Sequence, residues 1–396
     1  MKLTERIQLR KTELLSKMCY AANNLYNLAN YYVRQEFFYF NDWLRYDDLW
    51  HALKDKDAHK ALPSQTSQQV LKLVDKNWKS FFKALKEYKE RPGRFSGRPR
   101  PPKYKEKRGE FVVAFSNQQC RIKAGFVHFP RRTRLPPVKN RLKEGLRQVR
   151  IVPRDYYYVF KIIYERNETS LHLDEKRIVG IDLGLNNVAT VVNNAGFRPA
   201  VIKGGAIKSI NQFYNKQRAK LASVKDKQGI GFETRRLQRL VRKQNNKIHD
   251  AFHKISRTIV NYCAKHDFGT IVNEYNVTWK QGIKMGRKNN QNFFQVPFLK
   301  LVNQIVYKAE LVGIRVVKVN EAYTSKYSFL DGEPIARRSR YLGSRVSRGL
   351  FKTNKGALIN ADVNAGYNIV KKAFPNAILA DGIEGLGLIQ YSITVS

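Results

Sequence analysis

Three acidic residues, far apart in the 396-residue chain, have the types and settings to support chemistry together. Asp182 ends an apolar run that turns at Gly184, Glu274 closes a second apolar run, and Asp362 stands where a helix capped by Asn360 is expected. A carboxylate held among β-branched residues is costly to bury unless it is paired or binds a metal. Asp182 therefore needs partners, and the two later acids fit that role.

The chemistry that such acids can perform is metal-assisted hydrolysis. Breaking a phosphodiester needs a more acidic water and a neutralised leaving oxygen, and two Mg²⁺ ions provide both. Mg²⁺ takes hard oxygen ligands, and converging carboxylates repel one another unless cations intervene. We expect Asp182, Glu274 and Asp362 to be catalytic and to hold two Mg²⁺ ions, with Mn²⁺ as a substitute. Each acid alone has a simpler explanation: a turn residue, a surface strand end, and a first-turn helix acid favoured by the helix dipole.

The elements that must position these acids follow from the hydrophobic periodicity. The expected order is three strands, long helices, a strand, a helix, a strand and a helix. The ranges are a strand ending at Asp182, strands over 188–192 and 197–203, helices over 209–227 and 232–266, a strand over 269–274, a helix over 296–311, a strand over 314–320, and a helix from Asn360. An opening meander followed by alternating strands and helices is typical of an RNase H-like α/β domain. The polar loop 278–295 suits a lid.

The first part of the chain predicts a different architecture. One strand over 1–10 precedes two amphipathic helices, one from Thr12 and one from Ser64, and short β-rich runs fill residues 110–170. These runs suggest a small barrel or sandwich with the helices inserted after its first strand. The aromatic side chains of the second helix favour helix–helix packing over base stacking.

The charge of the chain points to a polyanionic partner. Lysine and arginine number 74 against 32 aspartate and glutamate residues, a net charge of +42 spread over the whole length. Nucleic acid is the first expectation, with a membrane surface or the ribosome as alternatives. The Pro- and Gly-rich basic segment 91–105 is either a mobile linker or a loop that orders on a nucleic-acid backbone. Both interpretations stay open.

Cysteine and histidine give no competing metal site. Cys19, Cys120 and Cys263 are isolated, with no CxxC spacing, so we expect buried thiols in a reducing compartment and no zinc. His249 and His253 are four residues apart but have no accompanying HExxH glutamate, and we expect them to be helix-surface residues or nucleic-acid contacts. The chain shows no signal peptide and no transmembrane run, which predicts a cytoplasmic protein without membrane partners.

At these residues the chain closely resembles the transposon-encoded TnpB family, compact relatives of the type V CRISPR effectors. The most specific parts are 180–184, 272–274 and 360–369, and the segment 97–105 is similar to the basic segment of the family. The resemblance places Asp182, Glu274 and Asp362 in the three RuvC acid positions. It implies an RNA-guided DNA endonuclease.

The resemblance also implies a domain plan. The fold would be multidomain α+β, a small wedge-like β-barrel with a helical recognition insert, followed by an RNase H-like RuvC nuclease domain. The expected parts are the first barrel strand 1–10, the insert 11–95, the rest of the barrel 96–172, the nuclease domain 173–323, a basic target-binding insertion 324–357, and the last nuclease part with the tail 358–396. Many members carry a four-cysteine zinc ribbon, whereas here Tyr327 stands near the first cysteine position and no cysteine follows Cys263. Zinc is excluded on ligand count.

The implied partners are a guide RNA from the transposon end and double-stranded target DNA, recognised beside a short adjacent motif. Base pairing reads the sequence, so the protein holds backbones. The residues expected to bind nucleic acid are Arg91, Arg94, Arg98, Arg100, Lys103, Tyr104, Lys105, Lys216, Arg235, Arg236, Arg239, Lys280, Arg345 and Arg348. A dimer on the RNA stays open. The rival functions are a nuclease-deficient RNA-guided repressor, which should have lost acids, an unguided RNase H-like nuclease or transposase, and a basic RNA-binding scaffold.

Overall fold

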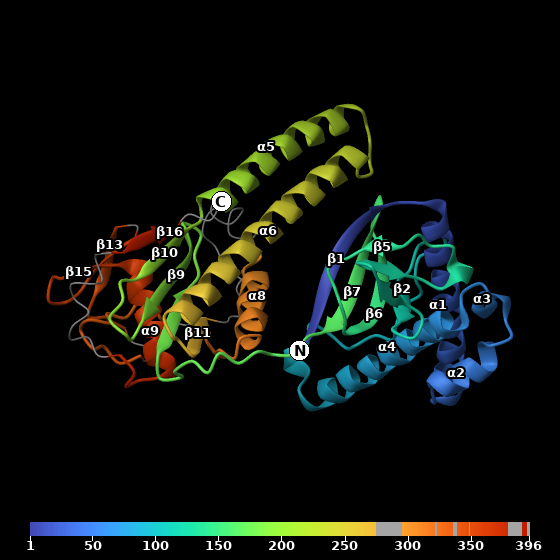
Figure 1. Ribbon diagram of the computed structural model, residues 1–396, viewed down its shortest axis with the longest axis horizontal. Coiled ribbons are helices and arrows are strands. Elements are labelled where there is room, and N and C mark those ends of the chain that lie inside the picture. Colours follow the sequence, from blue (N-terminus) through green and yellow to red (C-terminus); the bar gives the residue numbers. More distant parts are fainter. Residues whose placement is uncertain (275–294, 321–322, 336–338, 348, 379–389, 394–396) are drawn as a thin grey trace. The chain divides into compact units, whose positions relative to one another are not determined.

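The computed structural model describes residues 1–274, 295–320, 323–335, 339–347, 349–378 and 390–393. The chain divides into two units, Met1–Arg166 and Asn167–Ser396, which run from blue to green and from green to red in Figure 1. Both units mix helices and strands. Residues 278–294 of the expected lid, 278–295, lie outside the described residues.

Helices make up the first half of unit 1. They are α1 (Glu13–Phe40), α2 (Tyr46–Leu53), α3 (Asp57–Lys60) and α4 (Ser64–Glu90). Thr12 begins α1 by accepting a hydrogen bond from the Leu15 amide at 3.3 Å, as an N-cap does. Trp78 of α4 is fully buried and donates to Asn30 of α1 at 2.9 Å. The expected helix–helix packing of the aromatic residues is therefore confirmed.

The strands of unit 1 form two sheets. Their order is β1-β7-β6-β2 in one and β3-β4-β5 in the other, with bounds β1 (Lys2–Arg10), β2 (Val113–Ser116), β3 (Arg121–Lys123), β4 (Phe126–His128), β5 (Val138–Lys139), β6 (Leu146–Pro153) and β7 (Tyr157–Glu165). Strand β1 pairs with β7 from Lys2 opposite Glu165 to Arg10 opposite Tyr157, although the helices separate them in sequence. The strands of this unit pair in two separate sheets, so their pairing does not confirm a single closed barrel, and the choice between the expected barrel and sandwich stays open.

The basic segment after α4 is held against α1. The turn η1 (Pro92–Arg94) ends α4, and the chain then runs along α1. The amides of Asn23 and Asn27 donate to the carbonyl oxygens of Glu106 and Lys105 at 2.8 and 3.1 Å. Arg34 donates to the carbonyl of Pro102 at 2.9 Å. Residues 102–106 are thus fixed by the protein itself, so the mobile-linker interpretation is wrong for this part.

Unit 2 is built on a six-stranded sheet of order β12-β11-β8-β9-β10-β16. The strands are β8 (Ile178–Asp182), β9 (Asn187–Asn193), β10 (Ala200–Lys203), β11 (Thr270–Glu274), β12 (Arg315–Val319) and β16 (Tyr391–Ile393). The first three form an antiparallel meander, and β11 and β12 add in parallel beside β8. The expected element order is confirmed as far as β12. The sequence analysis treated β16 as a tail and missed its parallel pairing with β10.

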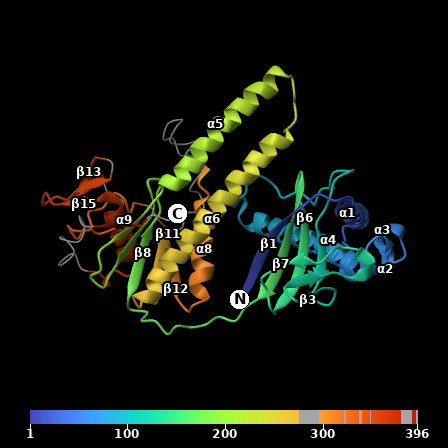
Figure 2. The same cartoon turned by 45° about the horizontal axis from the view of Figure 1, so that its top comes forward.

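Helices cover both faces of this sheet. They are α5 (Gly205–Lys227), α6 (Arg235–Lys265), α8 (Phe298–Glu310) and α9 (Ala361–Ala373). Alternate residues of β8 separate the two layers: Val179 and Ile181 pack with α6 and α8, whereas Ile178 packs with α9. Figure 2 shows α6 and α8 together and α9 (red) on the other side of the sheet.

The segment 324–357 contributes two strands, β13 (Ser344–Ser347) and β14 (Leu350–Lys352), to a small sheet of order β13-β14-β15, whose third strand β15 (Leu358–Asn360) follows the segment. The Glu333 carboxylate is buried and accepts the amides of Ser328 and Leu342 at 2.9 and 3.2 Å. Asn364 of α9 donates to the Tyr327 carbonyl at 2.7 Å and accepts from the Phe329 amide at 2.9 Å. Packing and hydrogen bonds to α9 thus hold the described parts of a segment that lacks the periodicity of a helix or strand.

No helix in the described part of the chain is both long enough and apolar enough to span a bilayer.

Candidate active site

Asp182 and Glu274 lie at the same end of two neighbouring parallel strands. Ile181 of β8 stands opposite Asn273 of β11, so the next residue of each strand is an acid. Ile181 and Asn273, the residues before the two acids, face α6 and α8. Because successive side chains of a strand point to opposite faces of the sheet, Asp182 and Glu274 both face the α9 side. Glu274 is buried, and its Oε1 accepts the backbone N–H of Leu183 at 2.8 Å. The turn after β8 therefore fixes the Glu274 carboxylate.

Asp362 reaches this end of the sheet from the first turn of α9. Asn360 caps the helix, since its Oδ1 accepts the amides of Asp362 and Val363 at 2.9 and 3.1 Å. This confirms the expected cap. Oδ2 of Asp362 accepts a hydrogen bond from Nδ2 of Asn187 at 2.8 Å. The third acid is thus fixed twice, by its own helix and by β9.

Two glycines let α9 approach the sheet closely. A Cβ atom on Gly180 would lie 2.4 Å from Val370 Cγ2 and 2.8 Å from the Gly366 carbonyl oxygen. A Cβ atom on Gly366 would lie 3.0 Å from Val192 Cγ1. Gly180 precedes Asp182 on β8, so this contact sets how near the helix that carries Asp362 comes to the strand that carries Asp182.

The donor set fits magnesium by type. Three carboxylates offer the hard oxygens that Mg²⁺ takes, and it keeps water in its remaining positions. However, among the described residues no three His, Cys, Asp or Glu side chains are close enough together to hold a metal ion. The structure brings the acids to one end of the sheet and fixes two carboxylates by hydrogen bonds. The magnesium assignment stays a prediction.

Arg345 lies beside the third acid. Its Nη2 is 4.0 Å from Oδ1 of Asp362, and its side chain is half exposed. The sequence analysis named Arg345 only as a nucleic-acid contact, because the segment 324–357 has no periodicity to place it. At the end of the sheet, a guanidinium next to the acids can bind a phosphate oxygen in bidentate fashion. Asn187 was also missed as a site residue.

The other residues expected to contact nucleic acid are all exposed where the structure describes them. The guanidinium carbon of Arg34 lies 5.2 Å from the centroid of the Tyr104 ring. The ammonium nitrogen of Lys105 lies 5.0 Å from the centroid of the Tyr26 ring. Lys216 is on α5, and α6 carries Arg235, Arg236 and Arg239. Along the segment after α4, the exposed residues are Arg91, Arg94, Arg98, Arg100 and Lys103. Lys280 and Arg348 lie outside the described residues. Contact with nucleic acid stays a prediction for the whole set.

The cysteines and one histidine pair are shaped by burial. Cys19, Cys120 and Cys263 are buried and free, and burial raises the pKa of each thiol to about 12. His253 is half-buried: burial, followed by the neighbouring His249, lowers its pKa to about 4. The His253 carbonyl accepts from the ammonium of Lys308 at 2.6 Å. Burial of Lys308, reinforced by Arg257, lowers the Lys308 pKa to about 8.

Two family models match the chain. The model of OrfB_IS605, a probable transposase, matches residues 161–280, and the model of a Cas12f1-like TNB domain matches residues 298–369. The first match includes Asp182 and Glu274, and the second includes Asp362. The second also spans the cysteine-free segment 324–357.

Known proteins resemble the chain over different lengths. A TnpB-like protein of Acidianus two-tailed virus is 23% identical over 401 residues, which span 91% of this chain and 83% of the viral protein. The CRISPR-associated endodeoxyribonuclease Cas12f1 of Sulfoacidibacillus thermotolerans is 29% identical over 240 residues, or 57% of this chain and 53% of Cas12f1. A solved Cas12f1–sgRNA–target DNA complex matches with a TM-score of 0.56 and 16% identity, over 90% of this chain and 81% of that chain, which shows a shared fold.

Proposed function

This chain is a member of the TnpB family, related to the type V CRISPR effectors, and on that basis we propose that it is an RNA-guided endonuclease that cuts DNA. The observation that carries the proposal is the meeting of Asp182, Glu274 and Asp362 at one end of the sheet. The acids come from two parallel strands and from the start of a helix that packs on one of them.

In this proposal the second unit is a RuvC-like nuclease domain of the RNase H-like type. The strand order β12-β11-β8-β9-β10, with an antiparallel meander and two parallel additions, supports it. The first unit, with helices between β1 and β2, would be the wedge and recognition part. Segment 324–357 would be the target-binding insertion, held without zinc by Glu333 and by hydrogen bonds to α9.

The acids would hold two Mg²⁺ ions. Bound there, the ions would make the attacking water more acidic and neutralise charge on the leaving oxygen. The Leu183 N–H keeps the Glu274 carboxylate turned to the sheet end, and Asn187 does the same for Asp362. Arg345 would bind the phosphate beside the cut, because its guanidinium lies against Asp362 and is open to solvent on one side.

The guide would be an RNA from the end of the transposable element, paired with one strand of the DNA target. The net charge of +42 supports a protein that grips phosphate backbones while base pairing reads the sequence. Substantial exposed basic surface lies on α5, α6 and the segment 91–105, which gives both units a share in that grip.

The test separates guided cleavage from its rivals. The full chain is purified with its bound RNA, the RNA is sequenced, and cleavage of a matched DNA duplex is measured with Mg²⁺. Asp182→Ala, Glu274→Gln and Asp362→Asn should each abolish cleavage and leave RNA and DNA binding within about twofold, because metal ligands serve the chemical step. The matched control is Asp226→Ala, an exposed acid at the end of α5.

Three outcomes would contradict the proposal in different ways. Normal cleavage by Asp182→Ala would remove the site assignment. Guided binding with no cleavage by the unaltered chain would indicate a repressor. Cleavage that does not depend on the bound RNA would indicate an unguided nuclease.

A further inference from the structure

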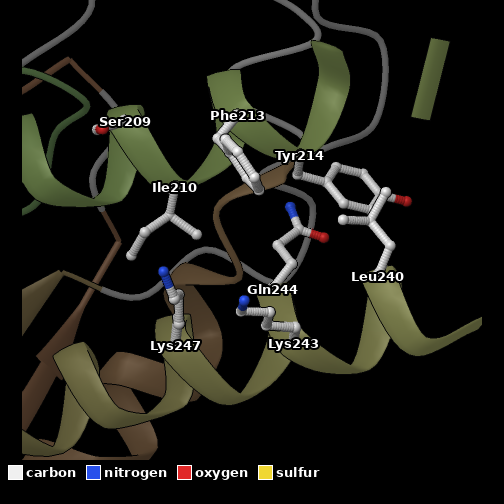
Figure 3. Close-up of a pocket in the computed structure, with 8 residues that line it drawn as sticks. All are labelled: Ser209, Ile210, Phe213, Tyr214, Leu240, Lys243, Gln244 and Lys247. Atoms are coloured by element: carbon white, nitrogen blue, oxygen red, sulfur yellow. The ribbon is translucent and has the colours of Figure 1, made fainter. Parts of the chain in front are cut away.

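A cleft lies between α5 and α6, and none of the three acids lines it. Its volume is about 210 Å³. Ile210 and Phe213 of α5 and Leu240 of α6 form an apolar lining, and Lys243, Gln244 and Lys247 of α6 add polar groups. Figure 3 shows the Phe213 ring pointing from α5 toward the α6 side chains. A volume below the usual range for small-molecule pockets suits one flat ring system.

Phe213 is an open aromatic surface within this cleft. Its side chain is 53% exposed, whereas α5 buries only Ile207 and Asn211 among its residues. The ring therefore contributes little to the core of the unit. An aromatic face open to solvent, with a second helix opposite, can stack on a planar ligand without rearrangement of the fold.

Two of the polar groups of the cleft are cationic, and no acid neutralises them within the described residues. Lys243 and Lys247 are exposed and make no ion pair within the described parts of the chain. They lie one helical turn apart, so both ammonium groups stand on the same side of α6. The ligand that matches them is an anion, and its phosphates would lie next to the ring on Phe213.

Gln244 gives the cleft a directional hydrogen-bonding group. Its Nε2 donates to Oδ1 of Asn211 at 2.8 Å, and Asn211 is only 2% exposed. Because a buried side chain holds the amide nitrogen, the orientation of the Gln244 amide is set before any ligand arrives. Its carbonyl oxygen can accept an N–H from the edge of a nucleobase.

We propose that this cleft binds one unstacked nucleobase of a single-stranded nucleic acid. The base stacks on Phe213 and meets Gln244 at its edge, and the flanking phosphates contact Lys243 and Lys247. The inference rests on the proposed function only in taking nucleic acid as the ligand of this chain. The strand is either RNA, such as an exposed part of the guide, or the DNA strand displaced from the target.

The experiment measures the binding of the full chain, freed of RNA at high salt, to a fluorescent 12-nucleotide single strand by anisotropy. Four probes are used: RNA and DNA, each in an intact form and in a form without bases. Phe213→Ala should weaken binding of the intact strand about five- to hundredfold and leave binding of the base-free strand unchanged, since stacking needs a base. Phe213→Leu, which keeps apolar volume without a π face, should behave in the same way.

The matched controls come from the same helical hairpin. Phe232 is 72% exposed in the connection between α5 and α6 and does not line the cleft, so Phe232→Ala should bind every probe as the unaltered chain does. Lys243→Gln and Lys247→Gln should weaken intact and base-free strands alike. Each should lower the slope of log affinity against log salt by about 0.7. The melting temperature of each variant verifies the fold.

The outcomes decide the inference and its source of ligand. A Phe213-dependent loss confined to intact RNA assigns the cleft to the guide, and one confined to intact DNA assigns it to the displaced strand. An equal loss on intact and base-free strands, or a loss no larger than that of Phe232→Ala, overturns the inference while the proposed function stands. If the unaltered chain binds none of the probes, the inference fails, whereas the proposed function is decided separately by cleavage with the co-purified RNA.

Discussion

Asn187 and Asp362 are joined across the active-site end of unit 2 by a hydrogen bond of 2.8 Å from the amide nitrogen to Oδ2. The bond connects the first residue of β9 to the first turn of α9. It fixes the orientation of the Asp362 carboxylate, the third of the three acids. Mutation of a group that orients a metal ligand typically costs about 10- to 100-fold in metal affinity or activity.

We therefore expect Asn187→Ala to lower the rate of DNA cleavage about 10- to 100-fold, with guide and target binding unchanged. The measurement is single-turnover cleavage over a magnesium titration, in which the variant should also need more Mg²⁺. Asn186→Ala is the control, since the Asn186 amide accepts from Lys208 instead. A variant as fast as the control would show that Asp362 needs no orientation by β9.

Arg345 is expected to act on the phosphate at the cut. Arg345→Ala should slow cleavage at least tenfold, because a charge-assisted bidentate contact would be lost. Arg345→Lys should recover only part of the rate, because an ammonium cannot form two parallel hydrogen bonds to one phosphate. Arg340→Ala, an exposed arginine in the same segment, is the control. Equal losses in target binding for Arg345→Ala and Arg340→Ala would make Arg345 an ordinary backbone contact.

Two chelators should distinguish a requirement for Mg²⁺ from a requirement for zinc. Removal of divalent cations with EDTA should stop cleavage, and Mg²⁺ or Mn²⁺ should restore it. A zinc-selective chelator should change neither the rate nor the melting temperature, because Glu333 and α9 hold the described parts of segment 324–357 through hydrogen bonds. Elemental analysis checks this directly. Stoichiometric zinc in the purified protein would contradict the prediction.

Gly180→Ala should disturb the site through the backbone. The new methyl group would meet Val370 and the Gly366 carbonyl at distances that no real contact tolerates, so α9 must shift. Overpacking of this kind costs about 1–3 kcal/mol, which lowers the melting temperature by about 2–4 °C per kcal/mol in a unit of this size. Cleavage should fall further than stability explains. Gly231→Ala is the control, because nothing lies within 4 Å of its Cβ position. Unchanged cleavage by Gly180→Ala would show that the geometry of the site does not depend on the contact between β8 and α9.

His253 should make the protein less stable in mild acid. Its pKa is lowered to about 4 by burial and by the neighbouring His249 and Lys308, with Arg257 adding to the effect and Asp250 opposing it. The unfolded chain takes up this proton near the ordinary value of 6.5. Stability is therefore lost as pH falls from about 6.5 toward 4, where the unfolded state binds more protons.

His253→Gln should remove much of that dependence. The melting temperature measured between pH 7.5 and 5.0 should fall less steeply in the variant than in the unaltered chain. His51→Gln, a substitution of an exposed histidine in unit 1, serves as the control and should keep the full slope. Identical slopes in all three proteins would show that His253 is not the group responsible.

The sequence predicted what periodicity and capping determine locally. The meander that delivers Asp182, the strand that ends at Glu274 and the cap at Asn360 all follow from residue types within a few positions. The pairing of β1 with β7 did not, because hydrogen bonds between distant strands leave no local pattern. For the same reason, the short β-rich runs left the choice between a barrel and a sandwich open.

The contacts that complete the site could not be predicted from the sequence for a related reason. Arg345 and Glu333 lie in a segment without periodicity, and their roles depend on Asp362 and on backbone amides that only the fold brings near. Strand β16 has the alternation of a strand, Tyr391-Ser392-Ile393, but three residues are too few to distinguish it from a loop. The basic residues were identified by composition alone, which gives charge and exposure but no ligand.

The contact between β8 and α9 also has a consequence for how each molecule is made. Chains are synthesised at about 5–20 residues per second, so the ribosome needs on the order of 10–40 s to travel from Asp182 to Asp362. During that interval unit 1 has already emerged with its basic surface, while the strand that carries Asp182 still waits for its helix. In the proposed function, a nascent molecule would therefore carry the basic surface of unit 1 well before all three acids of the candidate site are in place.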